Sequence, residues 1–250
     1  MSAPPFPWAG HTALITGASA GIGRALCRAL VADGVRVAAL ARRADRLSDL
    51  RDELGDALLP LACDLRDEAQ IRAAFEAVAE RWGGVDVLIN NAGLGHEQRL
   101  MDGETEAWRE MLEVNVLALC VCTREALTQM RARGVSGHVV HVSSMAAHRV
   151  PPGSGVYSAT KYAVRALTEA LRKELREAGS GIRVTSVSPG LVETEFHKHF
   201  TGSADAAAQL YGSLRVLDAA DVVSAVRYVL AQPPHVEVHD VLLRPTAQET

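Results

Sequence analysis

The chain has 250 residues, of which 48% are hydrophobic, and a formal net charge of −4 at pH 7. This length suffices for a large core in one domain, and the acidic balance argues against nucleic acid or an anionic membrane as a partner held by general charge. Because no secretory signal, no transmembrane-length apolar stretch and no disulfide or zinc spacing occurs, we expect a cytoplasmic protein with reduced thiols at Cys27, Cys63, Cys120 and Cys122.

Short apolar runs alternate with longer helical patterns from residue 12 to residue 244. Several runs are rich in Val and Ile and apolar on both sides, as buried parallel strands are. The alternation predicts a single α/β domain over residues 1–250, with a Rossmann-type doubly wound parallel sheet of about seven strands and helices on both faces. Such a sheet binds ligands at the carboxyl ends of its strands, where the strand order reverses. The predicted strands are 12–16, 35–40, 57–63, 85–90, 137–143, 182–188 and 238–244.

The first run leads directly into TGASAGIG, residues 16–23. Its glycines allow a tight turn and a close approach to a diphosphate, with a helix N-terminus behind it. The spacing TGxxxGxG differs from the common GxGxxG fingerprint, and the absence of a following Gly-Lys-Ser/Thr excludes a Walker A loop. We therefore predict a dinucleotide-binding loop with contacts from Gly17, Ser19, Gly21, Ile22 and Gly23.

The second run ends in LARR, where an enzyme that uses NAD usually carries an acid for the ribose 2′-hydroxyl. Arg42 and Arg43 stand there instead, and no carboxylate follows until Asp45. Arginine suits a 2′-phosphate, so NADP(H) is favoured over NAD(H). The alternative is that one or both arginines solvate the start of a helix.

The next segments carry helical signals. Leucines recur at helical spacing in 46–55, and Gly55 ends that predicted helix. Apolar residues recur at spacings of three and four in 67–83, where Asp67 suits the N-cap.

The sequence YSATK places Tyr157 and Lys161 one helical turn apart, so they share a face of the predicted helix. A nearby ammonium stabilises a phenolate and should lower the pKa of Tyr157. Such a pair is usually inert on a helix, but Ser144 ends a predicted strand upstream and Asn115 lies in another helix. Strand alternation lets only one of Ser143 and Ser144 face a site, and alternation alone does not decide between them.

Together TGASAGIG, NNAG at 90–93, Asn115, Ser144 and the Tyr157–Lys161 pair resemble the short-chain dehydrogenase/reductase family over nearly the whole chain. The C-terminal sequence also resembles NADP-dependent reductases and 3-hydroxy acid dehydrogenases within it. The resemblance implies hydride transfer with Tyr157 as general acid/base and Ser144 as the partner of the substrate oxygen. It also implies that Lys161 binds the nicotinamide ribose and that Asn115 holds a water of a proton relay.

The same resemblance assigns further cofactor contacts. Asp64 and Leu65 follow the third predicted strand and should meet the adenine, although Asp64 could be an ordinary cap or turn residue. The NNAG segment should line the ribose and nicotinamide side, and the segment after the sixth strand should lie under the nicotinamide. The residues so assigned are Asn90, Asn91, Ala92, Gly93, Pro189, Gly190, Val192 and Thr194.

The histidines divide into two groups. His96 and His148 follow NNAG and the Ser144 loop, so either could touch substrate, or neither could. The other group consists of two pairs, His197 with His199 and His235 with His239. Neither pair has a carboxylate at metal-site spacing, so we expect no metal.

Two further features concern specificity and assembly. Residues 195–217 carry helical and polar pieces without strong periodicity and are predicted to form the substrate-binding lid. A stripe of alanines on the Tyr157 helix either packs on the protein's own sheet or, as the resemblance implies, meets a second copy in a homodimer or homotetramer. The stripe consists of Ala159, Ala163, Ala166 and Ala170.

The expected function is an NADP(H)-dependent oxidoreductase acting on a small-molecule carbonyl or alcohol, with a ketone, a 3-hydroxy acid and a steroid all open as substrates. An NAD-dependent 3-hydroxy acid dehydrogenase is one alternative, and a cofactor-binding sensor without turnover is another. A nucleotide-sugar epimerase is disfavoured because the sequence after Pro189 leaves little room for a second substrate domain.

Overall fold

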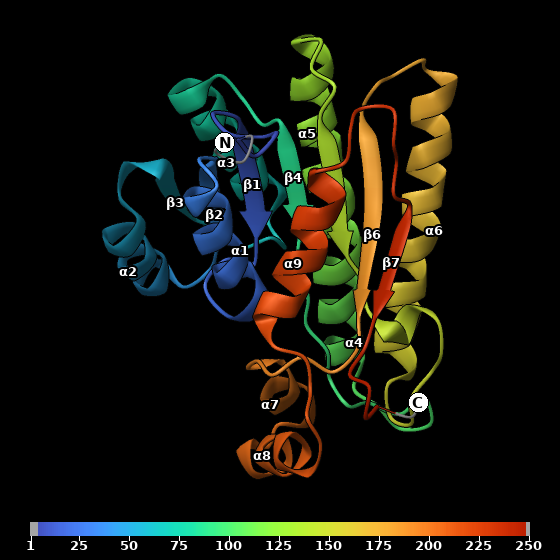
Figure 1. The fold of residues 1–250 in the computed structure, drawn as a ribbon. Coiled ribbons are helices and arrows are strands. Elements are labelled where there is room, and N and C mark those ends of the chain that lie inside the picture. The colour runs from blue at the N-terminus through green and yellow to red at the C-terminus, as the bar shows by residue number, and fades with distance from the viewer. Residues whose placement is uncertain (1–4, 249–250) are drawn as a thin grey trace.

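Seven parallel strands form one sheet in the order β3-β2-β1-β4-β5-β6-β7 (Figure 1). The computed structural model describes residues 5–248, so residues 1–4 and 249–250 of the predicted 1–250 domain lie outside the described residues. The predicted fold class is confirmed. Strand order reverses between β1 and β4, which makes their carboxyl ends the expected ligand site. The strands are Thr12–Thr16, Arg36–Ala41, Leu58–Ala62, Val87–Asn90, His138–Val142, Arg183–Pro189 and Asp240–Leu243, β1 to β7 in chain order.

Helices cover both faces of the sheet. Alternate residues of β1 separate two apolar cores: Ala13 and Ile15 pack with α1, α2 and α9, whereas Leu14 packs with α3, α5 and α6. No helix within residues 5–248 is long and apolar enough to cross a membrane. The α-helices α1 to α9 are Gly21–Ala32, Ala44–Leu54, Glu68–Trp82, Thr105–Leu112, Ala118–Ala132, Gly155–Glu177, Phe196–Thr201, Ala204–Ser213 and Ala219–Leu230, and the short helices η1 to η3 are Gly55–Ala57, Glu113–Leu117 and Met145–Ala147.

Local signals set the ends of α2 and α3 as predicted. The Asp67 carboxylate accepts hydrogen bonds from the backbone N–H groups of Ala69 and Gln70, at 2.9 and 3.4 Å, and so caps α3. Helix α2 ends at Gly55, whose φ of 69° is easily adopted only by glycine.

The four cysteines are free thiols, as predicted. Cys27, Cys63 and Cys122 are buried and Cys120 is half-buried. Burial raises the pKa of Cys27 to about 12 and that of Cys63 to about 11. Because the thiolate is the reactive form, these two residues contribute packing rather than chemistry.

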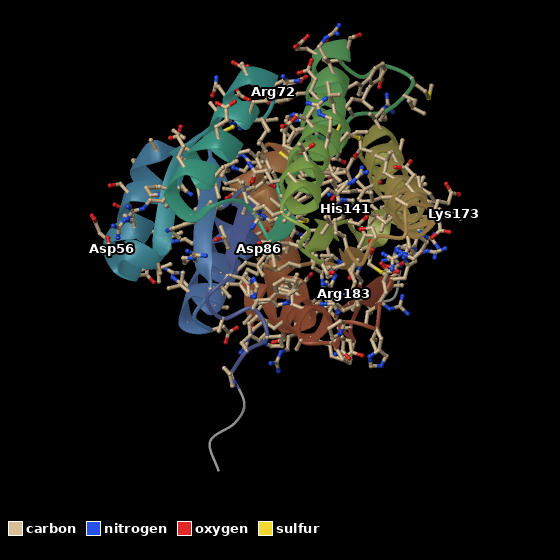
Figure 2. The ribbon with its side chains drawn as sticks, turned by 90° about the horizontal axis from the view of Figure 1, so that it is seen from above. Asp56, Arg72, Asp86, His141, Lys173 and Arg183 are labelled. Carbon is tan, nitrogen blue, oxygen red and sulfur yellow. The ribbon has the colours of Figure 1, made fainter. Side chains whose placement is uncertain are left out.

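A buried polar network fixes α6 on the sheet. Asn90 Nδ2 donates to Thr123 Oγ1 on α5 at 3.0 Å, and Thr168 Oγ1 on α6 donates to the Val164 carbonyl at 2.8 Å. His141 of β5 lies in the interior between these hydroxyls, with Nε2 3.3 Å from Thr123 and Nδ1 2.9 Å from Thr168 (Figure 2). Since the Thr168 proton is engaged, His141 donates from Nδ1 and accepts at Nε2. Burial lowers the pKa of His141 to about 3, so the ring is neutral.

Candidate active site

The loop between β1 and α1 is built for close backbone approach. Gly17 and Gly21 have φ values of 68° and 50°, a region that L side chains rarely adopt. A Cβ on Gly23 would collide with the Gly17 carbonyl oxygen and would lie 2.6 Å from Asn91 Nδ2. Gly23 therefore lets the first turn of α1 press against the loop, and a helix N-terminus carries N–H groups without a partner in the helix.

The NNAG segment after β4 is clamped to β1. Asn91 N and Ala92 N both donate to Thr16 Oγ1 at 3.0 Å, and Asn91 Nδ2 donates to the Thr16 carbonyl at 2.9 Å. Asn90 was expected to line the site, but its buried amide turns to Thr123 in the polar network instead. The Asn90 side chain therefore does not line the cavity described below, because the side chains of consecutive strand residues point to opposite faces.

A cavity of about 470 Å³ runs along the carboxyl ends of β1, β2 and β4. Its glycine cradle, its helix N-terminus and its basic end fit a dinucleotide. Of the predicted cofactor residues, those lining it are Gly17, Ser19, Gly21, Ile22, Arg42, Arg43, Asp64, Leu65, Asn91, Ala92, Gly93 and Thr194. The lining residues that were not predicted as cofactor contacts include His96, Glu110, Glu195, Phe196 and His199.

The structure does not bring every predicted cofactor residue to this cavity. Gly190 donates its N–H to the Leu243 carbonyl at 2.7 Å, and Val192 packs against the core beside α1 and α9. The predicted residues outside the lining are Gly23, Tyr157, Lys161, Pro189, Gly190 and Val192.

Three charged residues and one serine form a hydrogen-bonded cluster at the basic end of the cavity. Arg43 donates from Nε and Nη2 to Ser19 Oγ at 3.1 and 3.0 Å, and from Nη1 to Glu195 at 2.9 Å. Arg46, in the first turn of α2, donates to the same carboxylate at 2.8 Å. The hydrogen bonds from Arg43 and Arg46 hold the pKa of Glu195 below its usual value. Sequence reasoning missed Arg46, although its position one helical turn beyond Arg42 and Arg43 was a signal.

A second charged group lies at the end of the cavity that follows β3. The Asp64 carboxylate accepts from the Arg66 backbone N–H at 3.0 Å and pairs with the Arg66 guanidinium at 2.6 Å, which lowers the pKa of Asp64. Glu110 of α4 lies 2.9 Å from His96 Nε2 and 3.8 Å from Arg42. Asp64 thus lines the cavity and stabilises its own turn, so both expected roles are compatible.

Ser144, Tyr157 and Lys161 meet where β5 ends beside α6. Tyr157 and Lys161 are both buried, with exposed fractions of 8% and 5%, and Lys161 Nζ lies 5.8 Å from the Tyr157 ring centre. Lys161 Nζ donates to the Val142 carbonyl at 3.1 Å. Ser144 hydrogen-bonds Tyr157, whereas Ser143 Oγ donates to the Lys161 carbonyl at 3.4 Å. The two serines therefore contact different residues, and Ser144 is the one that contacts the Tyr157 phenol.

The pKa of Tyr157 does not move in the expected direction. Burial raises it to about 12, and the hydrogen bond with Ser144 opposes the rise. Burial also lowers the pKa of Lys161 to about 8. Desolvation dominates the pKa of Tyr157, and the rings of Phe196 and Phe200 on α7 lie against this side chain.

Asn115 lies in η2, a single π-helical turn that interrupts the chain between α4 and α5. Asn115 Nδ2 donates to the Leu94 carbonyl at 2.8 Å and to Thr160 Oγ1 at 3.0 Å, and Oδ1 accepts from Leu94 N at 2.9 Å. Both donors are therefore used, one to hold the segment after Gly93 and the other to bind α6. One acceptor position on Oδ1 is left.

The predicted lid, 195–217, contains two helices that lie beyond the carboxyl end of the sheet, α7 and α8 (Figure 1). Phe196 and Phe200 of α7 lie 5.3 and 5.9 Å from Tyr157, ring centre to ring centre. A Cβ on Gly95 would lie within 3.0 Å of all three rings. This aromatic cover explains why the cavity stops short of Tyr157.

His96 and His148 both pair with polar residues other than Ser144, Tyr157 and Lys161. His96 pairs with Glu110, and His148 Nε2 lies 3.2 Å from Ser188 Oγ and 3.7 Å from Asp240. Within residues 5–248 no three His, Cys, Asp or Glu residues gather as metal ligands would.

The sheet topology and the glycine-lined cavity at its switch point define a nicotinamide-dinucleotide-binding protein of the Rossmann type. A family model described as short chain dehydrogenase matches residues 11–204. The chain belongs to this family of oxidoreductases, which confirms the resemblance found in the sequence.

Individual relatives agree over nearly their whole lengths. The chain is 49% identical to dehydrogenase/reductase SDR family member 11 of Gallus gallus, over 96% of this chain and 98% of that one. It is 40% identical to farnesol dehydrogenase of Aedes aegypti, over 97% and 98%. Among solved structures it resembles the closed form of serine dehydrogenase complexed with NADP+, with a TM-score of 0.91, 35% identity and 96% of each chain covered.

Proposed function

We propose that the chain is an NADP(H)-dependent oxidoreductase that interconverts a carbonyl compound and an alcohol, with Tyr157 as the general acid and base. The observation that carries the proposal is the meeting of Ser144, Tyr157 and Lys161 beside the dinucleotide cavity. A Cβ on Gly93, which lines that cavity, would lie 3.2 Å from Lys161 Nζ. Bound there, the dinucleotide supplies or accepts the hydride.

Each side chain then has a defined part in moving the proton. Tyr157 gives its phenolic proton to the substrate oxygen in reduction and takes it back in oxidation. Ser144 donates a hydrogen bond to the same oxygen as negative charge develops on it. Lys161, whose pKa of about 8 lies near neutrality, replaces the proton on Tyr157, and the free acceptor on Asn115 Oδ1 holds a water next to Lys161.

The preference for NADP(H) rests on the basic end of the cavity. Arg43 is already oriented by Ser19 of the phosphate loop, and Arg42 and Arg46 lie on either side of it in sequence. A planar guanidinium held in this way suits a phosphate better than a hydroxyl. The similar serine dehydrogenase structure is a complex with NADP+, which is consistent with this assignment.

The surroundings of Tyr157 favour an apolar substrate over a 3-hydroxy acid. Met111, Trp108 and Leu94 pack with Tyr157, Phe196 and Phe200 in one apolar cluster. A substrate that reaches the phenol either displaces this cluster or packs against it. An aldehyde, a ketone or a steroid-like carbonyl compound therefore gains more binding free energy there than a carboxylate does. The name of the Aedes relative, farnesol dehydrogenase, points to the same substrate class.

We also propose a homodimer or homotetramer formed through α5 and α6. A hollow of about 530 Å³ lies between these helices, away from Tyr157, and Ala170 lines it. Ala159, Ala166 and Tyr162 are exposed on the same helix. The molar mass from light scattering tests this assembly, and a monomer would contradict it.

One experiment tests the function. Purified protein is assayed spectrophotometrically with NADPH and a panel of aldehydes, ketones, diketones and steroids, and with NADP+ and secondary alcohols or 3-hydroxy acids. Tyr157→Phe runs beside every reaction, and Tyr162→Phe, an exposed tyrosine of the same helix, is the matched control. We expect turnover that Tyr157→Phe abolishes and Tyr162→Phe retains, with NADPH binding unchanged in both.

Two results would redirect the assignment. Turnover that survives in Tyr157→Phe would contradict the role of the phenol. Tight NADPH binding without turnover on any compound would favour the sensor that binds the cofactor without chemistry.

A further inference from the structure

Glu195 engages the two arginines Arg43 and Arg46 at the basic end of the cavity. It lines the cavity, and its carboxylate accepts from Arg43 at 2.9 Å and from Arg46 at 2.8 and 3.0 Å. Two guanidinium groups that converge on an oxyanion make the donor set that a phosphate monoester uses. Here the oxyanion comes from the protein itself, from a residue 149 positions beyond Arg46 in the sequence.

Glu195 also begins the segment that covers the candidate catalytic tyrosine. Phe196 follows it directly, and the rings of Phe196 and Phe200 lie against Tyr157. Phe196 N donates to Thr194 Oγ1 at 3.2 Å, so the turn that carries Glu195 is continuous with the start of α7. A change in the contacts of Glu195 is therefore transmitted over one residue to the cover of Tyr157.

We propose that Glu195 is an internal competitor for the 2′-phosphate site and couples the cofactor to the position of α7. The proposal rests on the NADP(H) preference proposed above. When a 2′-phosphate binds Arg43 and Arg46, Glu195 loses its ion pairs with them. The start of α7 is then no longer bound to α2. NADH carries no 2′-phosphate, so it leaves the Glu195 pairs in place.

The charges make this exchange favourable. A phosphate monoester carries more negative charge near neutral pH than a carboxylate and has three acceptor oxygens. Arg43 keeps its bonds to Ser19 during the exchange, so its guanidinium need not be reorganised. The Glu195 and arginine side chains are 34–42% exposed, which makes the ion pairs weak enough to be displaced.

The test compares Glu195→Gln with Glu193→Gln. Glu193 is exposed, lies two residues away and forms no ion pair within the described chain, so its substitution removes the same charge without touching the arginines. Dissociation constants for NADPH and NADH are measured by fluorescence titration of the cofactor-free protein. We expect Glu195→Gln to bind NADPH about three- to tenfold more tightly than the wild type does. NADH binding in that variant, and both affinities in Glu193→Gln, should stay within about twofold of the wild type.

Hydrogen exchange gives a second readout that does not depend on activity. In the wild type, NADPH should increase backbone exchange in 196–201 relative to NADH. In Glu195→Gln the two cofactors should give equal exchange there, because the tether is already gone.

The outcomes separate the two proposals. A wild type that binds NADPH and NADH equally refutes the NADP(H) preference, and the competition falls with it. A wild type that prefers NADPH while Glu195→Gln binds it no better, or more weakly, refutes the competition alone, since Glu195 would then help to hold the arginines. Equal gains in Glu195→Gln and Glu193→Gln would reduce the effect to general charge and also refute it.

Discussion

The buried charge of Lys161 is expected to lower the free energy of unfolding of the cofactor-free protein. Burial lowers its pKa from 10.5 to about 8, and the side chain is only 5% exposed, so solvent screens little of the effect. A shift of this size corresponds to about 3 kcal/mol between the charged and neutral forms. At pH 7 the lysine is charged in both the folded and the unfolded chain, so the folded state carries the whole penalty.

Lys161→Met removes that charge and keeps a side chain of similar length. It also loses the hydrogen bond from Nζ to the Val142 carbonyl, which costs about 1 kcal/mol. We expect a net gain of about 2 kcal/mol in the free energy of unfolding at pH 7, or roughly 4–8 °C in Tm. Between pH 8 and 10.5 the wild type loses the Lys161 proton on folding and regains stability, so the difference between the two proteins should shrink.

Urea unfolding of both proteins at about pH 7, 8.5 and 10 measures this difference, because other titrating groups cancel in the comparison. Lys173→Met is the control: Lys173 is exposed on the same helix, and its pair with Glu169 contributes about 1 kcal/mol or less. A less stable Lys161→Met at pH 7, or a difference that does not change with pH, would refute the reasoning.

Three other predictions concern the phosphate loop, the aromatic cover and the buried histidines. Gly23→Ala should abolish dinucleotide binding in a fluorescence titration, because its Cβ would meet the Gly17 carbonyl; binding within about twofold of the wild type would contradict this. Phe200→Ala should lower kcat/KM for apolar ketones about tenfold while leaving the NADPH dissociation constant unchanged; equal kcat/KM values would exclude a substrate contact. The free energy of unfolding should fall as the pH drops below 6.5, because burial lowers the pKa of His138 and His141 to about 3 and the unfolded chain binds protons first. His141→Gln should reduce that slope in urea unfolding, and an unchanged slope would oppose the assignment.

The features that depend on nearby residues could be predicted from the sequence. Strand positions followed from runs such as 12–16, the cap of α3 from Asp67, and the tight turn between β1 and α1 from three glycines within seven residues. Each of these signals is local, because it acts within one strand or one helical turn. The spacing of Tyr157 and Lys161 likewise placed both on one face of α6, and the structure adds that this face is buried.

The features that depend on chain topology could not be predicted. Glu195 meets Arg43 and Arg46 only because the segment after β6 returns to the start of α2, and no periodicity records such a meeting. The direction of the Tyr157 pKa was misjudged for a related reason. The two phenylalanines that bury the phenol come from α7, about forty residues later in the chain, and desolvation depends on which segments cover a group.

The His141 network has a consequence for the placement of α6. The hydrogen bonds of the network all run in one direction. Asn90 donates to Thr123, Thr123 to His141, His141 to Thr168, and Thr168 to the Val164 carbonyl. A slide of α6 by one residue would bring Leu167 or Glu169 opposite His141 in place of Thr168, and the neutral imidazole would lose its acceptor. The network thus fixes the register of α6 on the sheet. In this register Tyr157 lies beside Ser144. A substitution in this network that keeps the register of α6 must be accompanied by a second one, so that each hydrogen-bond donor still meets an acceptor.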